Sequence, residues 1–171
     1  MCIRRSMKNL YIASSLYNAE RIRRLIDRFQ KEGINITYNW TIHGQVYSEE
    51  ELTKFGIKEE QGVHECDVFL LVFPGRNGAH FEMGYARAAG KHIVLLEEVE
   101  VEQKTFYYLP DIVRFKEEDD AVQHILNYLD NIQISPSPQI NEGMVKKGGV
   151  NKKPTTPPPP PPKGQAGRRK V

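Results

Sequence analysis

The sequence predicts an α/β fold, a doubly wound parallel sheet of about five strands, and two observations indicate it. Short apolar runs, at 9–13, 68–73 and 92–96, alternate with longer segments in which apolar residues recur at helical spacing. The first of these longer segments stops at Gly33 and the third at Gly90, as helices commonly do. Strands that alternate with helices form a parallel sheet covered on both faces, and the flavodoxin-like, Rossmann-like strand order 2-1-3-4-5 is expected.

Each expected element follows from its local pattern. The first helix has one apolar face, made of Ile22, Leu25, Ile26 and Phe29. Ser48 precedes three glutamates, so it is the expected N-cap of the second helix. The expected strands are 9–13, 34–38, 68–73, 92–96 and 112–115, and the expected helices are 17–31, 48–65, 79–89 and 121–132. Segments 39–47 and 97–110 are expected to be loops.

The composition changes abruptly after Ile134, which predicts a folded domain, 1–134, and a disordered Pro-rich basic tail, 135–171. Nine of the eleven prolines lie in the tail, which has too few apolar residues to offset the entropy of ordering. Eight Lys or Arg against one Glu give the tail +7, so with +2 for the whole chain residues 1–134 carry −5. A nucleic-acid-binding core is therefore not indicated. Residues 157–162 are expected to form polyproline II, as a spacer or a ligand for a partner's aromatic groove. Residues 168–170 either contact nucleic acid or an anionic surface weakly or only keep the chain in solution.

The composition also bears on compartment and cofactors. No apolar stretch is long enough to cross a bilayer, and the first residues lack a signal-peptide apolar region. Cys2 and Cys66 are too few for a disulfide framework, and the five histidines show no metal-ligand spacing. We therefore expect a cytoplasmic protein with no membrane contact, no metal and no cofactor.

The most informative segment is PGRNGAHFEMGYARAAGKHIVLL, residues 74–96. It follows an apolar strand, and its first residues form a tight glycine-containing loop. The loop leads into a helix whose first turn is expected to carry Glu82. A strand, a glycine turn and a helix N-terminus together form a crevice that favours anions and nucleotides. An acid there either compensates the helix dipole or faces the ligand and does chemistry.

Other residues of the expected crevice narrow the chemistry. The chain has no nucleophile-elbow serine, Walker A loop or GxGxxG signature. What remains is a carboxylate nucleophile or base, Glu82, supported by Tyr11 and a second acid, Glu59. That set suits cleavage of a glycosidic bond, in which one carboxylate captures or stabilises the sugar carbon while another group protonates the leaving group.

Three segments resemble the nucleoside 2-deoxyribosyltransferase superfamily, which includes the transferases and the 2′-deoxynucleoside 5′-phosphate N-hydrolases. They are LYIASS at 10–15, the stretch from Glu59 to Val68 with Gly62, and GAHFEMGYA at 78–86. The last has Glu-Met-Gly-Tyr-Ala where the family has Glu-Leu-Gly-Tyr-Ala. The resemblance covers about residues 8–130.

The resemblance implies roles for individual residues. Glu82 would attack C1′ of the deoxyribose, and Tyr11 would orient it. The family places an Asp eight positions before the acid that opens strand three. This chain has Glu59 at that position, with Glu60 as the alternative, for a role beside the leaving base. Asp67 itself is expected to cap the strand or bond a nearby loop. The resemblance also implies a homo-oligomer, because pockets in the family are commonly completed by a neighbouring subunit.

Seven further residues are predicted to bind substrate, namely Ser14, Ser15, Trp40, Gly75, Arg76, Gly78 and His80. Many transferases carry an Asp six residues before the nucleophile, where this chain has Arg76. A cation and an imidazole, His80, beside a helix N-terminus suit a phosphate. In the alternative, Arg76 faces solvent and His80 caps the helix. Trp40 either stacks on the base or packs under its loop, and Tyr85 either flanks Glu82 or fills the core.

The sequence thus predicts an enzyme that cleaves or transfers the N-glycosidic bond of a 2′-deoxynucleoside or its 5′-monophosphate. Water as acceptor would make it a hydrolase, and a second base would make it a transferase. Two alternatives stay open. The stretch PGRNGAHFE resembles the Pro-Gly-Gly-x-Gly-Thr-x-x-Glu loop of cytokinin-type phosphoribohydrolases, which act on ribose. A non-catalytic nucleotide-sensing module is the other, although the presence of both Tyr11 and Glu82 argues against it.

Overall fold

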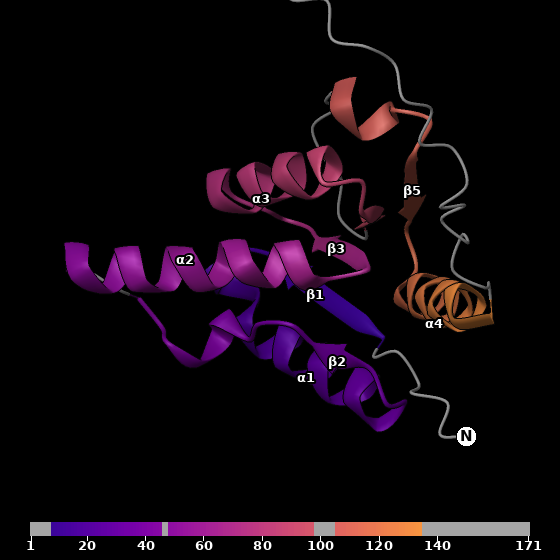
Figure 1. The fold of residues 1–171 in the computed structure, drawn as a ribbon, viewed down its shortest axis with the longest axis horizontal. Coiled ribbons are helices and arrows are strands. Elements are labelled where there is room, and N and C mark those ends of the chain that lie inside the picture. Colours follow the sequence, from indigo (N-terminus) through magenta and orange to yellow (C-terminus); the bar gives the residue numbers. More distant parts are fainter. Residues whose placement is uncertain (1–7, 46–47, 98–104, 135–171) are drawn as a thin grey trace, which may run out of the picture. The chain divides into compact units, whose positions relative to one another are not determined.

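The computed structural model describes residues 8–45, 48–97 and 105–134 (Figure 1). Five parallel strands form one sheet in the order β2-β1-β3-β4-β5, so the predicted α/β class and strand order are confirmed. The predictions for the tail, 135–171, including its polyproline segment and basic end, lie outside the described residues.

The strands lie close to where the apolar runs predicted them. They are β1 (Asn9–Ala13), β2 (Asn35–Ile36), β3 (Val68–Val72), β4 (His92–Leu96) and β5 (Ile112–Phe115). All five residues of the central strand β3 are buried, as expected for a parallel strand covered on both faces. The edge strand β2 is shorter than the predicted 34–38, because only Asn35 and Ile36 pair with β1.

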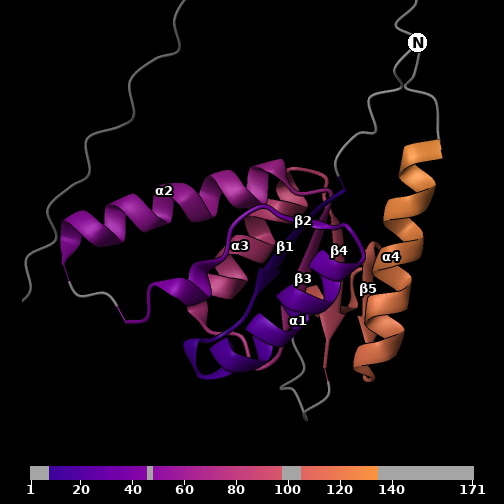
Figure 2. The ribbon, with the colours of Figure 1, turned by 90° about the horizontal axis from the view of Figure 1, so that it is seen from below.

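Within the described residues, four α-helices cover the sheet, two on each face (Figures 1 and 2). They are α1 (Ala19–Lys31), α2 (Glu49–Glu65), α3 (Asn77–Ala88) and α4 (Glu118–Ile134). Helices α2 and α3 pack together on one face. Helices α1 and α4 share the other, where Arg21 Nη2 lies 3.0 Å from Glu118 Oε2. Ser48 caps α2 as predicted, since its hydroxyl accepts a hydrogen bond from the Glu51 amide at 3.2 Å.

In the part of the chain that the structure describes, three short 3₁₀ turns lie between these elements, at Leu16–Asn18, Trp40–Ile42 and Thr105–Tyr108. The first replaces the start of the helix predicted at 17–31. None of the described helices combines the length and apolar character needed to cross a bilayer.

The start of α3 corrects one prediction. Arg76 has an extended backbone and serves as the N-cap, so the helix begins at Asn77 and its first turn holds no acid. Glu82 is the sixth residue of the helix and lies in the second turn. Because the dipole effect falls off beyond the first turn, compensation of the helix dipole does not explain this acid.

Gly62 brings α2 close to β1. A Cβ at this buried position would lie 2.7 Å from the Tyr38 Cβ and 3.1 Å from two carbons of the Tyr11 ring. Such a contact is shorter than real Cβ atoms make, so a side chain here would force the helix and the two tyrosines apart. The glycine therefore lets α2 deliver Glu59, one turn earlier, to the region of Tyr11.

Candidate active site

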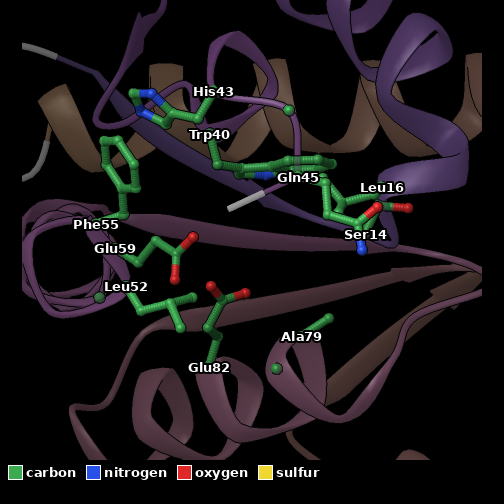
Figure 3. Close-up of a pocket in the computed structure, with 13 residues that line it drawn as sticks. Ser14, Leu16, Trp40, His43, Gln45, Leu52, Phe55, Glu59, Ala79 and Glu82 are labelled. Atoms are coloured by element: carbon green, nitrogen blue, oxygen red, sulfur yellow. The ribbon is translucent and has the colours of Figure 1, made fainter. Parts of the chain in front are cut away.

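A cavity of about 380 Å³ lies beside the end of β1, under α2 and the start of α3 (Figure 3). Its lining includes five of the predicted site residues, namely Ser14, Trp40, Glu59, Gly78 and Glu82. Figure 3 shows the carboxylates of Glu59 and Glu82 pointing toward each other from α2 and α3. Residues far apart in the sequence thus converge on one space, as the strand order predicted.

Tyr11 holds Glu82. The Tyr11 ring is fully buried in β1 and stacks on Phe69, with the ring planes 8° apart. Its hydroxyl donates a hydrogen bond to Glu82 Oε1 at 2.8 Å. A buried phenol needs such a partner, and the bond fixes the carboxylate at the cavity wall. The juxtaposition of Tyr11 and Glu82 that the resemblance implied is therefore present.

The surroundings of Glu82 change its acidity. Burial is the largest influence on its pKa, the Tyr11 hydrogen bond opposes it, and the nearby charge of Glu59 raises the pKa further, to about 7 in all. Burial and the Glu82 charge raise the pKa of Tyr11 well above its ordinary value, so the phenol stays a hydrogen-bond donor. A carboxylate that titrates near neutral pH and is held by a fixed donor is typical of a catalytic group.

Glu59 is the second carboxylate at the cavity, and burial raises its pKa as well. The alternative acid, Glu60, is exposed on α2 and does not belong to the cavity lining. Asp67 accepts a hydrogen bond from the Asn9 amide at 2.9 Å, so it joins β1 to the start of β3. That is the structural role predicted for it.

Trp40 both packs and faces the cavity. Its indole Nε1–H donates to the Ile12 carbonyl oxygen at 2.7 Å, and the residue is 9% exposed. The ring therefore has a fixed position in the cavity wall. Ser14 is fixed too, because its hydroxyl donates to the Val72 carbonyl at 2.8 Å and ties the ends of β1 and β3 together. Stacking of a base on Trp40 stays a prediction.

The other predicted substrate-binding residues lie outside the lining of this cavity. The Arg76 guanidinium lies over the Tyr17 ring, 4.7 Å from its centroid. His80 Nδ1 lies 2.8 Å from the Arg76 carbonyl oxygen and Nε2 lies 2.5 Å from the Tyr107 hydroxyl. Its ring thus contacts the carbonyl oxygen of the N-cap residue and not a helix amide, so capping of the helix by His80 stays a prediction.

Gly75 and Ser15, which were also predicted to bind substrate, lie outside the cavity lining as well. A side chain at Gly75 would contact Leu71 and the His80 ring, so this glycine permits close packing. Ser15 is 3% exposed, and its hydroxyl has no hydrogen-bond partner among the described residues. Tyr85 packs against the core. Substrate binding by Ser15, Gly75, Arg76 and His80 therefore stays a prediction.

The sequence analysis missed several residues of the cavity, including Leu16, His43, Gln45, Leu52 and Phe55. Leu52 and Phe55 precede Glu59 by seven and four positions on α2, so helical spacing from Glu59 could have found them. His43 and Gln45 belong to a loop with no regular pattern, and only its position after the second strand pointed to the crevice.

In the described part of the chain, no three His, Cys, Asp or Glu side chains are grouped so that they could hold a metal ion.

Comparisons with known proteins agree with the fold. No family model matches the chain, and no curated protein matches it. Similar solved structures include BlsM, which is 19% identical, with a TM-score of 0.55 and coverage of 79% of this chain and 99% of that chain. A 2-desoxiribosyltransferase from Leishmania mexicana is 17% identical, with a TM-score of 0.50 and coverage of 71% and 98%. A CMP N-glycosidase, BcmB, from Clostridium botulinum is 20% identical, with a TM-score of 0.48 and coverage of 74% and 100%.

At such identities the likeness shows the fold alone. This chain has the fold of a 2-deoxyribosyltransferase, so the resemblance carried by its sequence motifs is confirmed at the level of the fold.

Proposed function

We propose that this protein cleaves or transfers the N-glycosidic bond of a 2′-deoxynucleoside or its 5′-monophosphate. The observation that carries the proposal is Glu82, a cavity-facing carboxylate whose Oε1 accepts a hydrogen bond from the buried Tyr11 at 2.8 Å. A second carboxylate, Glu59, faces the same space. Two carboxylates in different surroundings are what cleavage of a glycosidic bond by a retaining mechanism requires. The fold shared with a 2-desoxiribosyltransferase supports the same reaction class.

In the first step an oxygen of Glu82 forms a bond to C1′ of the sugar. The C1′–N bond breaks at the same time, and its electron pair leaves with the base, which takes a proton from Glu59 or from water. Tyr11 orients the Glu82 carboxylate and stays protonated. Glu59 is suited to protonate the base because burial raises its pKa.

In the second step water or the nitrogen of another base attacks C1′, and the ester bond to Glu82 breaks. With water, Glu59 takes the proton and the products are deoxyribose or its 5′-phosphate. With a base, Glu59 takes the proton of the attacking nitrogen, and the product is a new nucleoside or nucleotide. Both outcomes share the first step, and the acceptor therefore does not alter the role proposed for Glu82.

The start of α3 supports a 5′-phosphate as part of the substrate. Gly78, in the first turn of α3, lines the cavity together with the hydroxyl-bearing Ser14. Backbone amides at a helix N-terminus suit a phosphate. The Ser14 hydroxyl already donates to the Val72 carbonyl, so the phosphate would have to be bound by the amides at this end of the cavity. Arg76 lies at the same end of the helix and would add a positive charge.

The direct test is to incubate the full-length protein with deoxynucleosides, their 5′-monophosphates and the matching ribonucleotides, and to detect free base by chromatography. We expect free base from at least one deoxynucleotide. A second, unlabelled base in the mixture distinguishes transfer from hydrolysis. Release only from ribonucleotides would favour the phosphoribohydrolase alternative, and binding without release from any substrate would favour the sensing module.

A further inference from the structure

The cavity has two unlike ends, and Glu82 lies between them (Figure 3). One end has Ser14, directly after β1, and Ala79, in the first turn of α3. The other has His43 and Phe55, on the loop after β2 and on α2. If C1′ binds at Glu82, as the proposed function requires, the base and the rest of the sugar extend toward opposite ends. Amides and hydroxyls suit the sugar and its phosphate, and aromatic side chains suit the base.

The His43 ring is fixed at the aromatic end. It stacks on Phe55, with ring centroids 3.8 Å apart and planes 25° apart. Its Nε2 lies 2.5 Å from the Tyr38 hydroxyl oxygen. Tyr38 itself packs against Gly62 of α2. The ring position is therefore set by two neighbours that belong to separate elements.

The hydrogen bond to Tyr38 also sets which ring nitrogen carries the proton. The Tyr38 hydroxyl and His43 Nε2 form this contact. A phenol O–H is a stronger donor than an imidazole N–H, and an imidazole nitrogen is a stronger acceptor than a phenol oxygen, so we assign the phenol as donor and Nε2 as acceptor. Burial and the charges of Lys58 and Lys54 lower the pKa of His43, which favours the neutral ring. A neutral imidazole whose Nε2 accepts carries its proton on Nδ1 and can only donate there.

We propose that His43 is a specificity-determining residue that binds the leaving base by donating Nδ1–H to a carbonyl oxygen. The site then prefers bases with a keto group, such as uracil and hypoxanthine, over the matching amino bases, cytosine and adenine. An exocyclic amino group at that place would set two donors against each other and leave both without an acceptor. This inference rests on the proposed function for the position of the sugar, and it names the substrate class.

The test compares two matched pairs of ligands, dUMP with dCMP and dIMP with dAMP. The members of each pair exchange a keto group for an amino group, together with the protonation of the neighbouring ring nitrogen. Equilibrium binding is measured calorimetrically on full-length protein carrying Glu82→Ala, so that no turnover is needed. In this background His43→Phe keeps an aromatic ring on Phe55 and removes both ring nitrogens. Tyr38→Phe keeps the packing on Gly62 but removes the hydroxyl, so the proton of the His43 ring is no longer held on Nδ1. His64→Ala, an exposed histidine outside the cavity lining, is the matched control.

The parent protein should bind the keto member of each pair about two- to tenfold more tightly, the range of one neutral hydrogen bond. His43→Phe should remove the preference by weakening binding of the keto member. Tyr38→Phe should remove the preference by strengthening binding of the amino member. Without the Tyr38 hydroxyl the His43 proton can move to Nε2, and Nδ1 can then accept a hydrogen bond from the amino group. His64→Ala should keep the preference.

Equal binding within both pairs by the parent protein, or an equal loss for all four ligands in His43→Phe, would overturn the inference. The ratio of kcat/KM within each pair, measured with Glu82 in place, is the second measurement. The two proposals fail separately. A keto preference that depends on His43 without release of base would contradict the proposed function alone, and release of base with no effect of His43 on the ratio would contradict this inference alone.

Discussion

Glu82 and Glu59 face the same cavity from neighbouring helices, yet their surroundings differ. Burial raises the pKa of both. Glu82 is held by the buried Tyr11 at 2.8 Å, whereas Glu59 has no hydrogen-bond partner among the described residues. A fixed carboxylate whose charge is stabilised by a donor suits a nucleophile, and an unheld one with a raised pKa suits transfer of a proton. The proposed mechanism therefore assigns two different roles to two side chains of the same type.

The largest expected effect is that of removing the nucleophile. Glu82→Ala and Glu82→Gln should each lower kcat by about a thousandfold or more, because the proposed mechanism gives the capture of C1′ to Glu82 and only proton transfer to Glu59. Initial rates of base release measure this. Full activity in either variant would contradict the role of Glu82.

A stability measurement serves as the control for these variants. The pKa of Glu82 is raised from 4.5 in the unfolded chain to about 7 in the fold, so the fold binds the proton more tightly. Its contribution is therefore lost as the pH rises through that window. Glu82→Gln should unfold at higher temperature than the wild type at about pH 8 and differ little at about pH 4. A lower unfolding temperature at both pH values would indicate damage to the fold.

The second prediction concerns Glu59. Glu59→Gln should lower kcat by roughly a hundredfold or more, the effect of losing a general acid or base. The charge of Glu59 raises the pKa of Glu82, so its removal should lower that pKa. The acidic limb of the profile of kcat/KM against pH should move to lower pH. A limb that stays in place would show that the two carboxylates are not coupled.

Tyr11→Phe should give a smaller loss and the opposite shift in the pH profile. The Tyr11 hydrogen bond lowers the pKa of Glu82, so the variant should raise it and move the acidic limb to higher pH. A hydrogen bond to a charged group corresponds to about 10- to 100-fold in rate. Shifts of both variants in the same direction would rule out the assigned contributions of Tyr11 and Glu59.

The smallest effect is expected at Arg76, which lies over the Tyr17 ring and outside the cavity lining. Arg76→Ala should raise KM for a 5′-monophosphate by a few-fold, about the effect of a partly screened charge, and leave KM for the nucleoside unchanged. Arg87→Ala, at the other end of α3 and paired with Asp111, is the matched control. Equal changes for both substrates would remove Arg76 from phosphate binding.

The sequence predicted the fold and the central pair of the site because both depend on regular features. Alternating apolar and amphipathic segments set the strand order, and that order brings Tyr11 of β1 to Glu82 of α3. The start of α3 was predicted too late, because the glycine-rich stretch around Gly78 reads as a loop but is helical from Asn77.

Positions near the loops could not be predicted in the same way. A cation and an imidazole, Arg76 and His80, are side chains typical of a phosphate site. Their positions are set by contacts with the Tyr17 ring and the Tyr107 hydroxyl. The place of His43 depends on a contact with Phe55 twelve residues later. Local sequence contains no record of such tertiary contacts, so the positions of these three side chains come from the structure alone.

The central claim is that Glu82 bonds covalently to C1′, and trapping that bond tests it most directly. A 2-deoxy-2-fluoro substrate analogue slows the second step, so the full-length protein should gain the mass of the fluorinated sugar. Digestion and mass spectrometry should locate that mass on the peptide that contains Glu82, and Glu82→Gln should gain none. An adduct on Glu59 or another residue, or base release from the analogue with no adduct at any time, would contradict the account.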